Sequence, residues 1–208
     1  MKSESFVTVH VAHCGYHTLS RHPLIRTAAI IVTLIYTTLW YASPLCAMET
    51  HDIHTEYVKG EYRLVMNVTL AARADRVEKI LRDYAHYKAL DARILDSRII
   101  QRPQPTVVHL FTRVRVCFSF LCRNVDRVES VEERPMELLA TVIPEKSDAE
   151  RGSTHTVLIA EGDHTRVQYT TAIVPKFWVP ALFGRNMMLH TLRDATLSMF
   201  EHIEKMAQ

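Results

Sequence analysis

The sequence feature that most constrains the fold of this chain is a change in the spacing of its apolar residues. Apolar residues alternate from Glu61 to Leu70, then fall at helical spacing from Ala74 to Ala89, and then alternate again. A period of two predicts strands, and a period near 3.6 predicts an amphipathic helix or a pair of short ones. Six further strands are expected, over Ile94–Gln101, Thr106–Val116, Arg123–Glu133, Glu137–Ile143, Thr154–Glu161 and Arg166–Val174.

The chain returns to helical spacing from Pro180 to Met206. Its apolar stripe consists of Leu182, Leu189, Leu192, Ala195, Thr196, Met199 and Ile203. Consecutive strands followed by one long helix predict an α+β architecture, with the helix on one face of an antiparallel sheet. A curved sheet wrapped around a long C-terminal helix is a helix-grip arrangement, and it leaves a concave apolar space between the two.

The N-terminal segment has the layout of a secretory signal. Arg21 and Arg26 precede an apolar stretch over residues 28–42, Pro44 follows, and Ala47 offers a small residue for signal peptidase. The stretch is shorter than the roughly 20 residues of a transmembrane helix. We therefore expect a periplasmic or secreted protein, and the competing interpretation is an inner-membrane anchor through residues 27–43.

Three parts of the chain follow from this pattern. We expect residues 1–47 to be a signal peptide or an N-terminal membrane anchor, residues 48–60 a short tail, and residues 61–208 the folded α+β domain. The net charge of +2 lies entirely in the first part, so basic and acidic side chains balance in the remainder. A balanced domain lacks the electrostatic footprint of a nucleic-acid-binding protein.

Enzyme and cofactor signatures do not occur in the sequence. It contains no nucleophile motif, phosphate loop or dinucleotide fingerprint. The histidines on the predicted elements, His109, His155, His164 and His190, lack the spacing of a zinc site. No cofactor and no metal are therefore expected. Acid–base chemistry would need titratable groups in one cavity, and Glu129, His155, Glu161 and Tyr169 are the available groups. No pattern in the sequence brings them together, so no catalytic residue is assigned.

Cys117 and Cys122 are the two cysteines left after residue 47. An even pair in an exported domain predicts a disulfide; two free thiols in a reducing compartment are the alternative. If the cysteines face each other across a tight hairpin, Arg113 opposes Asp126 on the outer face. Arg127 and Glu129 then fall on the inner face. There they either pair with each other, orient the polar head of a ligand, or reach solvent at a twisted strand end.

Two apolar segments stand out from the pattern. Phe118 and Phe120 lie at the tip of the predicted hairpin, where turns are usually polar, and Phe177 and Trp178 precede the last helix. The tip either enters a bilayer, gates a cavity or folds onto the core. The second segment either anchors at a membrane surface, covers a cavity or docks the helix. A transient membrane contact is therefore one expectation.

The chain resembles the START-like superfamily of polyketide cyclases, lipid-transfer domains and coenzyme Q-binding proteins over roughly residues 56–205. Its exported bacterial members are similar at Cys117–Arg123, Arg127–Glu129, Ile143–Asp148, Gly152, Thr165–Tyr169 and Pro175–Pro180. The resemblance implies a START-like or Bet v 1-like helix-grip fold and a cavity for an apolar ligand, which would make residues 61–208 a START-like ligand-binding domain. Members differ in ligand, and only some catalyse a reaction. His155 departs from the family pattern, which has a tryptophan near this position.

We therefore expect an exported protein that binds or carries a hydrophobic small molecule, such as a lipid, quinone or isoprenoid. The residues expected at the cavity or its mouth are Phe118, Phe120, Arg127, Glu129, Tyr169, Phe177, Trp178 and Leu189. One alternative is a cyclase- or dehydratase-like enzyme that uses the same cavity. Another is a membrane-associated accessory protein, and the sequence identifies no protein partner.

Overall fold

The computed structural model describes residues 48–118, 121–179 and 184–208. These residues form one eight-stranded sheet in which every neighbouring pair of strands is antiparallel. The strands are β1 (Glu49–Val58), β2 (Glu61–Leu70), β3 (Ile94–Gln104), β4 (Val107–Phe118), β5 (Leu121–Arg134), β6 (Glu137–Val142), β7 (Ala149–Glu161) and β8 (His164–Pro175). The helices are α2 (Ala74–Leu81), α3 (Gly184–Ala207) and two short 3-10 helices, η1 (Tyr84–Ala89) and η2 (Pro144–Lys146).

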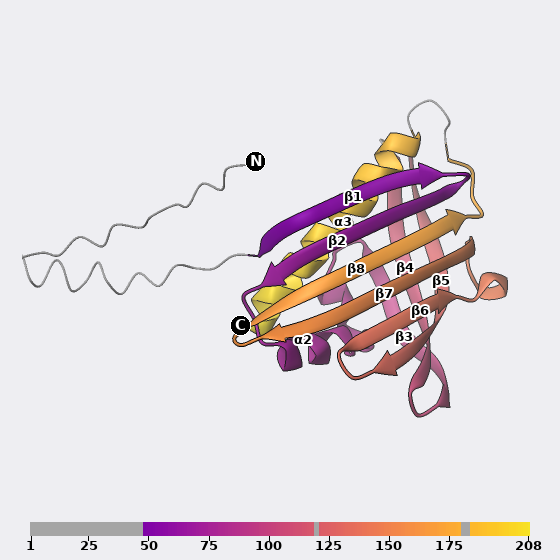
Figure 1. Ribbon diagram of the computed structural model, residues 1–208. Coiled ribbons are helices and arrows are strands. Elements are labelled where there is room, and N and C mark those ends of the chain that lie inside the picture. The colour runs from indigo at the N-terminus through magenta and orange to yellow at the C-terminus, as the bar shows by residue number, and fades with distance from the viewer. Residues whose placement is uncertain (1–47, 119–120, 180–183) are drawn as a thin grey trace, which may run out of the picture. The chain divides into compact units, whose positions relative to one another are not determined.

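The strand order β1-β2-β8-β7-β6-β5-β4-β3 follows from hairpins together with one long connection from β2 to β3. This connection carries α2 and η1, which close one end of the sheet. Figure 1 shows α3 running along one face of the sheet, behind β1 and β2 in that view. We call this face the inner face and the opposite one the outer face. The architecture is the expected α+β arrangement of a curved sheet and a long C-terminal helix.

The core lies between the inner face and the helices. Leu64, Met66 and Val68 alternate along β2 and are fully buried, as are Phe200 and Ile203 of α3. The apolar face of the strand therefore packs against the apolar face of the helix, as their amphipathic patterns require. Each fully buried aliphatic or aromatic side chain of this kind contributes about 1.5–3 kcal/mol to the free energy of folding.

The β4–β5 hairpin has the register that the cysteine pair predicts. Cys117 pairs with Cys122 and forms a disulfide with it, and Arg113 pairs with Asp126. The Arg113 guanidinium donates two hydrogen bonds to the Asp126 carboxylate, at 2.6 and 2.7 Å. These bonds lower the pKa of Asp126 and raise that of Arg113.

The first strand differs from the expectation. The sequence predicts a short tail over residues 48–60, whereas Glu49–Val58 form β1 and pair with β2. β1 is an edge strand and most of its side chains are exposed, so it lacks the apolar alternation that identifies the other strands. Helical spacing over 74–89 resolves into α2 and η1, the pair of short helices that the pattern allowed.

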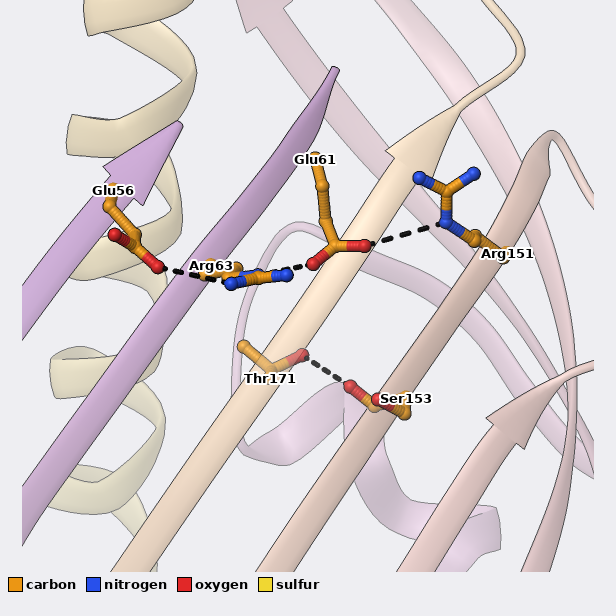
Figure 2. A network of polar contacts seen from close by, with 6 residues as sticks. All are labelled: Glu56, Glu61, Arg63, Arg151, Ser153 and Thr171. Atoms are coloured by element: carbon orange, nitrogen blue, oxygen red, sulfur yellow. Dashed lines mark hydrogen bonds and ion pairs between the residues drawn. The ribbon is translucent and has the colours of Figure 1, made fainter. Parts of the chain in front are cut away.

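Charged side chains cross the outer face at the end of the sheet where β1 turns into β2. Arg63 contacts both Glu56 and Glu61, and Glu61 also contacts Arg151 of β7 (Figure 2). The hydrogen bond from Arg63 lowers the pKa of Glu61, despite its partial burial. The network joins side chains of β1, β2 and β7 across the outer face, with β8 lying between β2 and β7 in the sheet.

Candidate ligand cavity between the sheet and the C-terminal helix

A cavity of about 200 Å³ lies between α3 and the inner face of the sheet. We call it the outer cavity. Its wall is mainly apolar and combines residues of β3, β4, β5, β8 and α3 with Phe177, which follows β8. The other apolar residues of the wall are Ile94, Val114, Val116, Val125, Ile173, Met188, Leu192, Ala195 and Met199. The side chains arrive there because inward positions recur every second residue on the strands and every three to four residues on α3.

A second cavity of about 90 Å³ lies deeper, toward α2 and η1. We call it the inner cavity. Three residues, Arg127, Tyr169 and Met199, line both cavities and therefore stand between them. The remaining wall of the inner cavity is formed by Leu81, Tyr84, Tyr87, Leu110, Glu129, Val131, Leu138, Ala140, Thr154 and Thr156.

An ion pair marks the junction of the two cavities. Arg127 and Glu129 are two residues apart on β5, so both project from its inner face. Arg127 Nε lies 3.1 Å from Glu129 Oε2, with 33% of the arginine side chain and 4% of the glutamate side chain exposed. The buried Nε lacks the geometry of a hydrogen bond to any atom of the described residues. Its donor capacity is therefore incompletely used inside an otherwise apolar space.

Two tyrosines add neutral hydrogen-bond donors to this region. Burial raises the pKa of Tyr169 and raises that of Tyr87 well above its usual value. Both phenols therefore stay protonated at neutral pH, because their usual pKa is already near 10. The Tyr87 hydroxyl donates to the Leu81 carbonyl at 2.5 Å, and the Tyr169 ring packs edge-on against Phe200, with centroids 5.4 Å apart.

Threonine hydroxyl groups add polar atoms to the walls of both cavities. Thr171 of β8 lines the outer cavity and Thr154 of β7 the inner one, with their Oγ1 atoms 3.0 Å apart. The Thr171 hydroxyl also lies 3.3 Å from the Ser153 carbonyl, to which it donates (Figure 2). These hydroxyls have partners in the sheet, in contrast to Arg127 Nε.

The outer cavity also has a charged side. Asp91, Arg93, Arg115 and Asp148 line it, and Arg115 is exposed. Asp91 accepts three hydrogen bonds from the Arg93 side chain, at 2.7–3.0 Å. This part of the wall therefore reaches solvent, while the Arg127–Glu129 pair lies at the buried end.

The structure separates the predicted site residues into groups. Arg127, Tyr169 and Phe177 line the outer cavity, and Glu129 lines the inner one. Leu189 lines neither cavity and packs instead beside Tyr62 and Met188. Trp178 is 77% exposed. Phe120 and the side chain of Phe118 lie outside the described residues.

Of the four titratable groups considered for catalysis, the structure brings two together. Glu129 and Tyr169 line the inner cavity. His155 instead hydrogen-bonds Glu137 at 2.6 Å on the exposed face, and Glu161 pairs with Arg166. Within the described ranges, no group of His, Cys, Asp and Glu side chains has the arrangement of a metal site.

Sequence reasoning missed several wall residues, including Tyr87, Arg93, Thr154, Thr156 and Thr171. Thr154 and Thr156 lie an even number of residues from the buried Leu158 on β7. Thr171 lies an even number from the buried Val167 on β8. The alternation of inward and outward side chains could therefore have located all three threonines. Their hydroxyls hid this signal, because a pattern of apolar residues counts threonine as polar. Arg93 lies in the turn between η1 and β3, where periodicity gives no information.

Solved structures from three organisms share this architecture. The Zhui aromatase/cyclase from Streptomyces sp. R1128 is 14% identical, with a TM-score of 0.59 over 71% of this chain and 93% of that one. A START superfamily protein from Mycobacterium smegmatis is 17% identical, with a TM-score of 0.56 and coverage of 69% and 97%. A STAR-related lipid transfer protein from Xanthomonas axonopodis is 14% identical, with a TM-score of 0.52 and coverage of 73% and 98%.

Sequence comparison gives no equivalent match. No protein-family model matches the chain, and no curated protein does. None of the helices in the described ranges is both long and apolar enough to span a membrane. Likeness at these identities bears on the fold alone, and it agrees with the strand order, the curved antiparallel sheet and the position of α3. The chain therefore has the helix-grip fold of START-like proteins.

Proposed function

We propose that this protein is an exported carrier that binds one compact hydrophobic molecule with a polar head, of the lipid, quinone or isoprenoid class. The observation that carries the proposal is an apolar cavity of about 200 Å³ whose buried end holds the Arg127–Glu129 pair. Burial of the apolar part of the ligand supplies the affinity, at about 25 cal/mol per Å² removed from water. The polar end sets its orientation.

Cavity size limits the ligand. Sites for drug-sized ligands typically measure about 300–1,000 Å³, and both cavities here are smaller. A single prenyl chain, a single acyl chain or one quinone ring fits this space better than a lipid with two acyl chains. A longer tail would extend past Arg115 to solvent.

The protein groups at the junction of the two cavities indicate the chemistry of the ligand's polar head. Arg127 Nε is a buried donor without an aligned acceptor, and the Tyr169 phenol remains protonated. Both can donate to a carbonyl or hydroxyl oxygen of a ligand, while Glu129 balances the guanidinium charge. A quinone carbonyl or an alcohol oxygen therefore suits this position better than an ammonium group.

Export is the second part of the proposal. The Cys117–Cys122 disulfide supports it, because structural disulfides persist in oxidising compartments. The basic and apolar segments before Ala47 support it independently.

Titration with N-phenyl-1-naphthylamine, an uncharged apolar fluorophore, tests whether the cavity accepts such molecules. We expect saturable binding of one probe per protein, with enhanced and blue-shifted emission, and competition by short-chain quinones or prenols. Absence of saturable binding by the probe and by offered lipids, quinones and prenols would contradict the carrier proposal.

The enzyme alternative retains one supporting observation, since Glu129 and Tyr169 line the same cavity. A cyclase or dehydratase would use one of these groups as an acid or base. In that case Glu129→Gln would abolish conversion of a bound substrate while leaving its binding intact. The carrier proposal expects the bound molecule to be recovered chemically unchanged from both proteins.

Membrane contact is the third part of the proposal, and Trp178 supports it. This side chain is 77% exposed and follows Phe177, which lines the cavity. Arginines lie near the residues on either side of it in the chain: the Arg123 guanidinium lies 4.5 Å from the Phe177 ring centroid, and Arg185 lines a pocket together with Phe177 and Val179. An exposed indole near cationic side chains suits the interface of an anionic bilayer.

Trp178→Ala is expected to weaken binding to phosphatidylglycerol vesicles several-fold in co-sedimentation. Trp178 is the single tryptophan of residues 48–208, so its emission in that part of the chain reports this site alone. We expect a blue shift on mixing with anionic vesicles and a smaller one with phosphatidylcholine vesicles. Met206→Ala, which removes an apolar side chain of 51% exposure, serves as the matched control. Equal binding by both variants would contradict the membrane contact.

A further inference from the structure

Glu204 places a carboxylate in the interior near the end of α3. The residue is 5% exposed, and each of its oxygens accepts one backbone hydrogen bond. Oε1 accepts from the Ala71 amide at 2.6 Å, and Oε2 accepts from the Met48 nitrogen at 2.9 Å. Within the described ranges, no Lys, Arg or His side chain forms an ion pair with this carboxylate.

A buried carboxylate without a cation is costly to maintain. Amide hydrogen bonds offset part of the lost hydration, but they bring only partial charges to the site. The guanidinium of Arg76 is committed to the end of the same helix, since its Nη1 donates to the backbone oxygens of Ala207 and Gln208 at 3.1 and 2.8 Å. A positive charge at one of the two donor positions would balance Glu204.

Only one of those positions can become charged. Ala71 lies between β2 and α2, inside the chain, so its nitrogen stays an amide. The Met48 nitrogen belongs to the peptide bond that follows Ala47, the small residue at which the sequence predicts cleavage. Hydrolysis of that bond would convert the donor at Glu204 into an α-amino group, which is protonated at neutral pH because its usual pKa is about 8.

We propose that the Ala47–Met48 peptide bond is the processing site and that the new α-ammonium of Met48 forms an ion pair with Glu204. The hydrolysis consumes one water molecule, leaves the carboxylate on Ala47 and gives the amine to Met48. The proposal rests on the export part of the proposed function and on none of its ligand part.

The position of Met48 suits this role. Its side chain packs against the main core, and the next residue, Glu49, already pairs with Thr69 of β2. The nitrogen is therefore held in place from both sides. The ion pair would tie the start of the edge strand β1 to α3, and so complete the domain once the leader has been removed.

Intact-mass analysis of the full 208-residue chain after expression and export in a Gram-negative host tests the processing site. We expect the mass of residues 48–208 with one disulfide. A mature N-terminus at any other residue would overturn the proposal, as would recovery of the uncleaved chain in the membrane.

Insertion of Gly-Ser between Ala47 and Met48 tests the ion pair. Cleavage after Ala47 then leaves two residues before Met48, which displaces the ammonium and restores an amide at Glu204. We expect the melting temperature to fall by about 5 °C, the size of shift that a loss of this kind gives in a domain of about 160 residues. The same two residues added after Gln208 are the control. An unchanged melting temperature would overturn the ion pair.

Glu204→Gln completes the comparison. In this background the insertion is expected to cause no further loss, because the amide side chain carries no charge for the ammonium to balance. If Glu204→Gln fails to fold, the acetylation rate of the α-amine provides an independent reading. We expect the native amine to react about tenfold more slowly than that of the inserted variant; equal rates would overturn the pair.

The two proposals fail separately. Glu204 lines neither cavity, so uptake of N-phenyl-1-naphthylamine is expected to be the same with and without the insertion. A wrong processing site leaves the carrier proposal untouched, and an absent ligand leaves the ion pair untouched.

Discussion

Replacing Ala195 with phenylalanine is expected to abolish ligand uptake without unfolding the protein. Ala195 is a half-buried residue of α3 that lines the outer cavity opposite Val114 and Val125. The added ring occupies part of this cavity, which has a volume of only about 200 Å³, and so removes space that the ligand would otherwise fill. If roughly 110 Å² of ligand surface is no longer buried, the free energy of binding becomes less favourable by about 2.7 kcal/mol, which is a 100-fold loss of affinity. Titration with N-phenyl-1-naphthylamine measures this loss.

The matched control places the same ring on the other side of the sheet. Val65 is 40% exposed on the outer face of β2, so Val65→Phe adds similar apolar bulk away from the cavity. This variant is expected to bind the probe like the wild type. Ala195→Phe is also expected to keep its melting temperature, since filling a void does not remove packing. Unaltered binding by Ala195→Phe would place the ligand elsewhere.

Arg127→Met is expected to lower the free energy of unfolding by about 2–3 kcal/mol. The substitution retains an apolar stem and removes the cation beside Glu129, which is buried and would then carry an unpaired charge. Breaking a fully buried pair costs about 3–5 kcal/mol. We expect less here because 33% of the Arg127 side chain is exposed. Urea unfolding followed by circular dichroism measures the change.

Addition of Glu129→Gln to Arg127→Met is expected to restore most of the loss, because the unpaired charge is removed. The exposed pair of the same hairpin is the control. Arg113→Met breaks the bond to Asp126, whose side chain is 35% exposed, and is expected to cost less than about 1 kcal/mol. Equal costs for Arg127→Met and Arg113→Met would show that Glu129 is not held as a buried charge.

The same double variant tests the orientation of the ligand. A probe without a polar head depends on the apolar walls alone, so its affinity is expected to change little. A quinone or prenol is expected to lose affinity, because the donor at the cavity junction is gone.

Local chemistry explains what the sequence could predict. The β4–β5 register follows from Cys117 and Cys122, because two cysteines joined across a tight turn fix every pairing along the two strands. Arg113 and Asp126 then have to meet, and Arg127 and Glu129 have to project inward. The antiparallel sheet and the C-terminal helix follow from hydrophobic periods in the same way.

Features that depend on how the strands and helices pack together are harder to predict from the sequence. β1 shows little alternation because an edge strand buries few side chains, so Glu49–Val58 looked like a tail. Helical phase misplaced Leu189, since the wall of the outer cavity follows Met188, Leu192, Ala195 and Met199 along α3. The stripe used for prediction was broad enough to include a neighbour about 100° around the helix.

The cavity itself depends on sheet curvature, which no local pattern specifies. Tyr169 and Glu129 are 40 positions apart in the chain and meet because β8 and β5 bend toward the same space. Their common location therefore emerges only from the three-dimensional structure, although the sequence identifies each side chain as a candidate.

Native mass spectrometry of the protein purified from the periplasm, followed by organic extraction and lipid analysis, tests the central claim most directly. The carrier proposal expects one apolar adduct per wild-type protein and none on Ala195→Phe, with a quinone, prenol or single-chain lipid in the extract. An adduct on both proteins would contradict binding in the outer cavity. Wild-type protein that carries no adduct and takes up none of the offered lipids, quinones or prenols would contradict the carrier function itself.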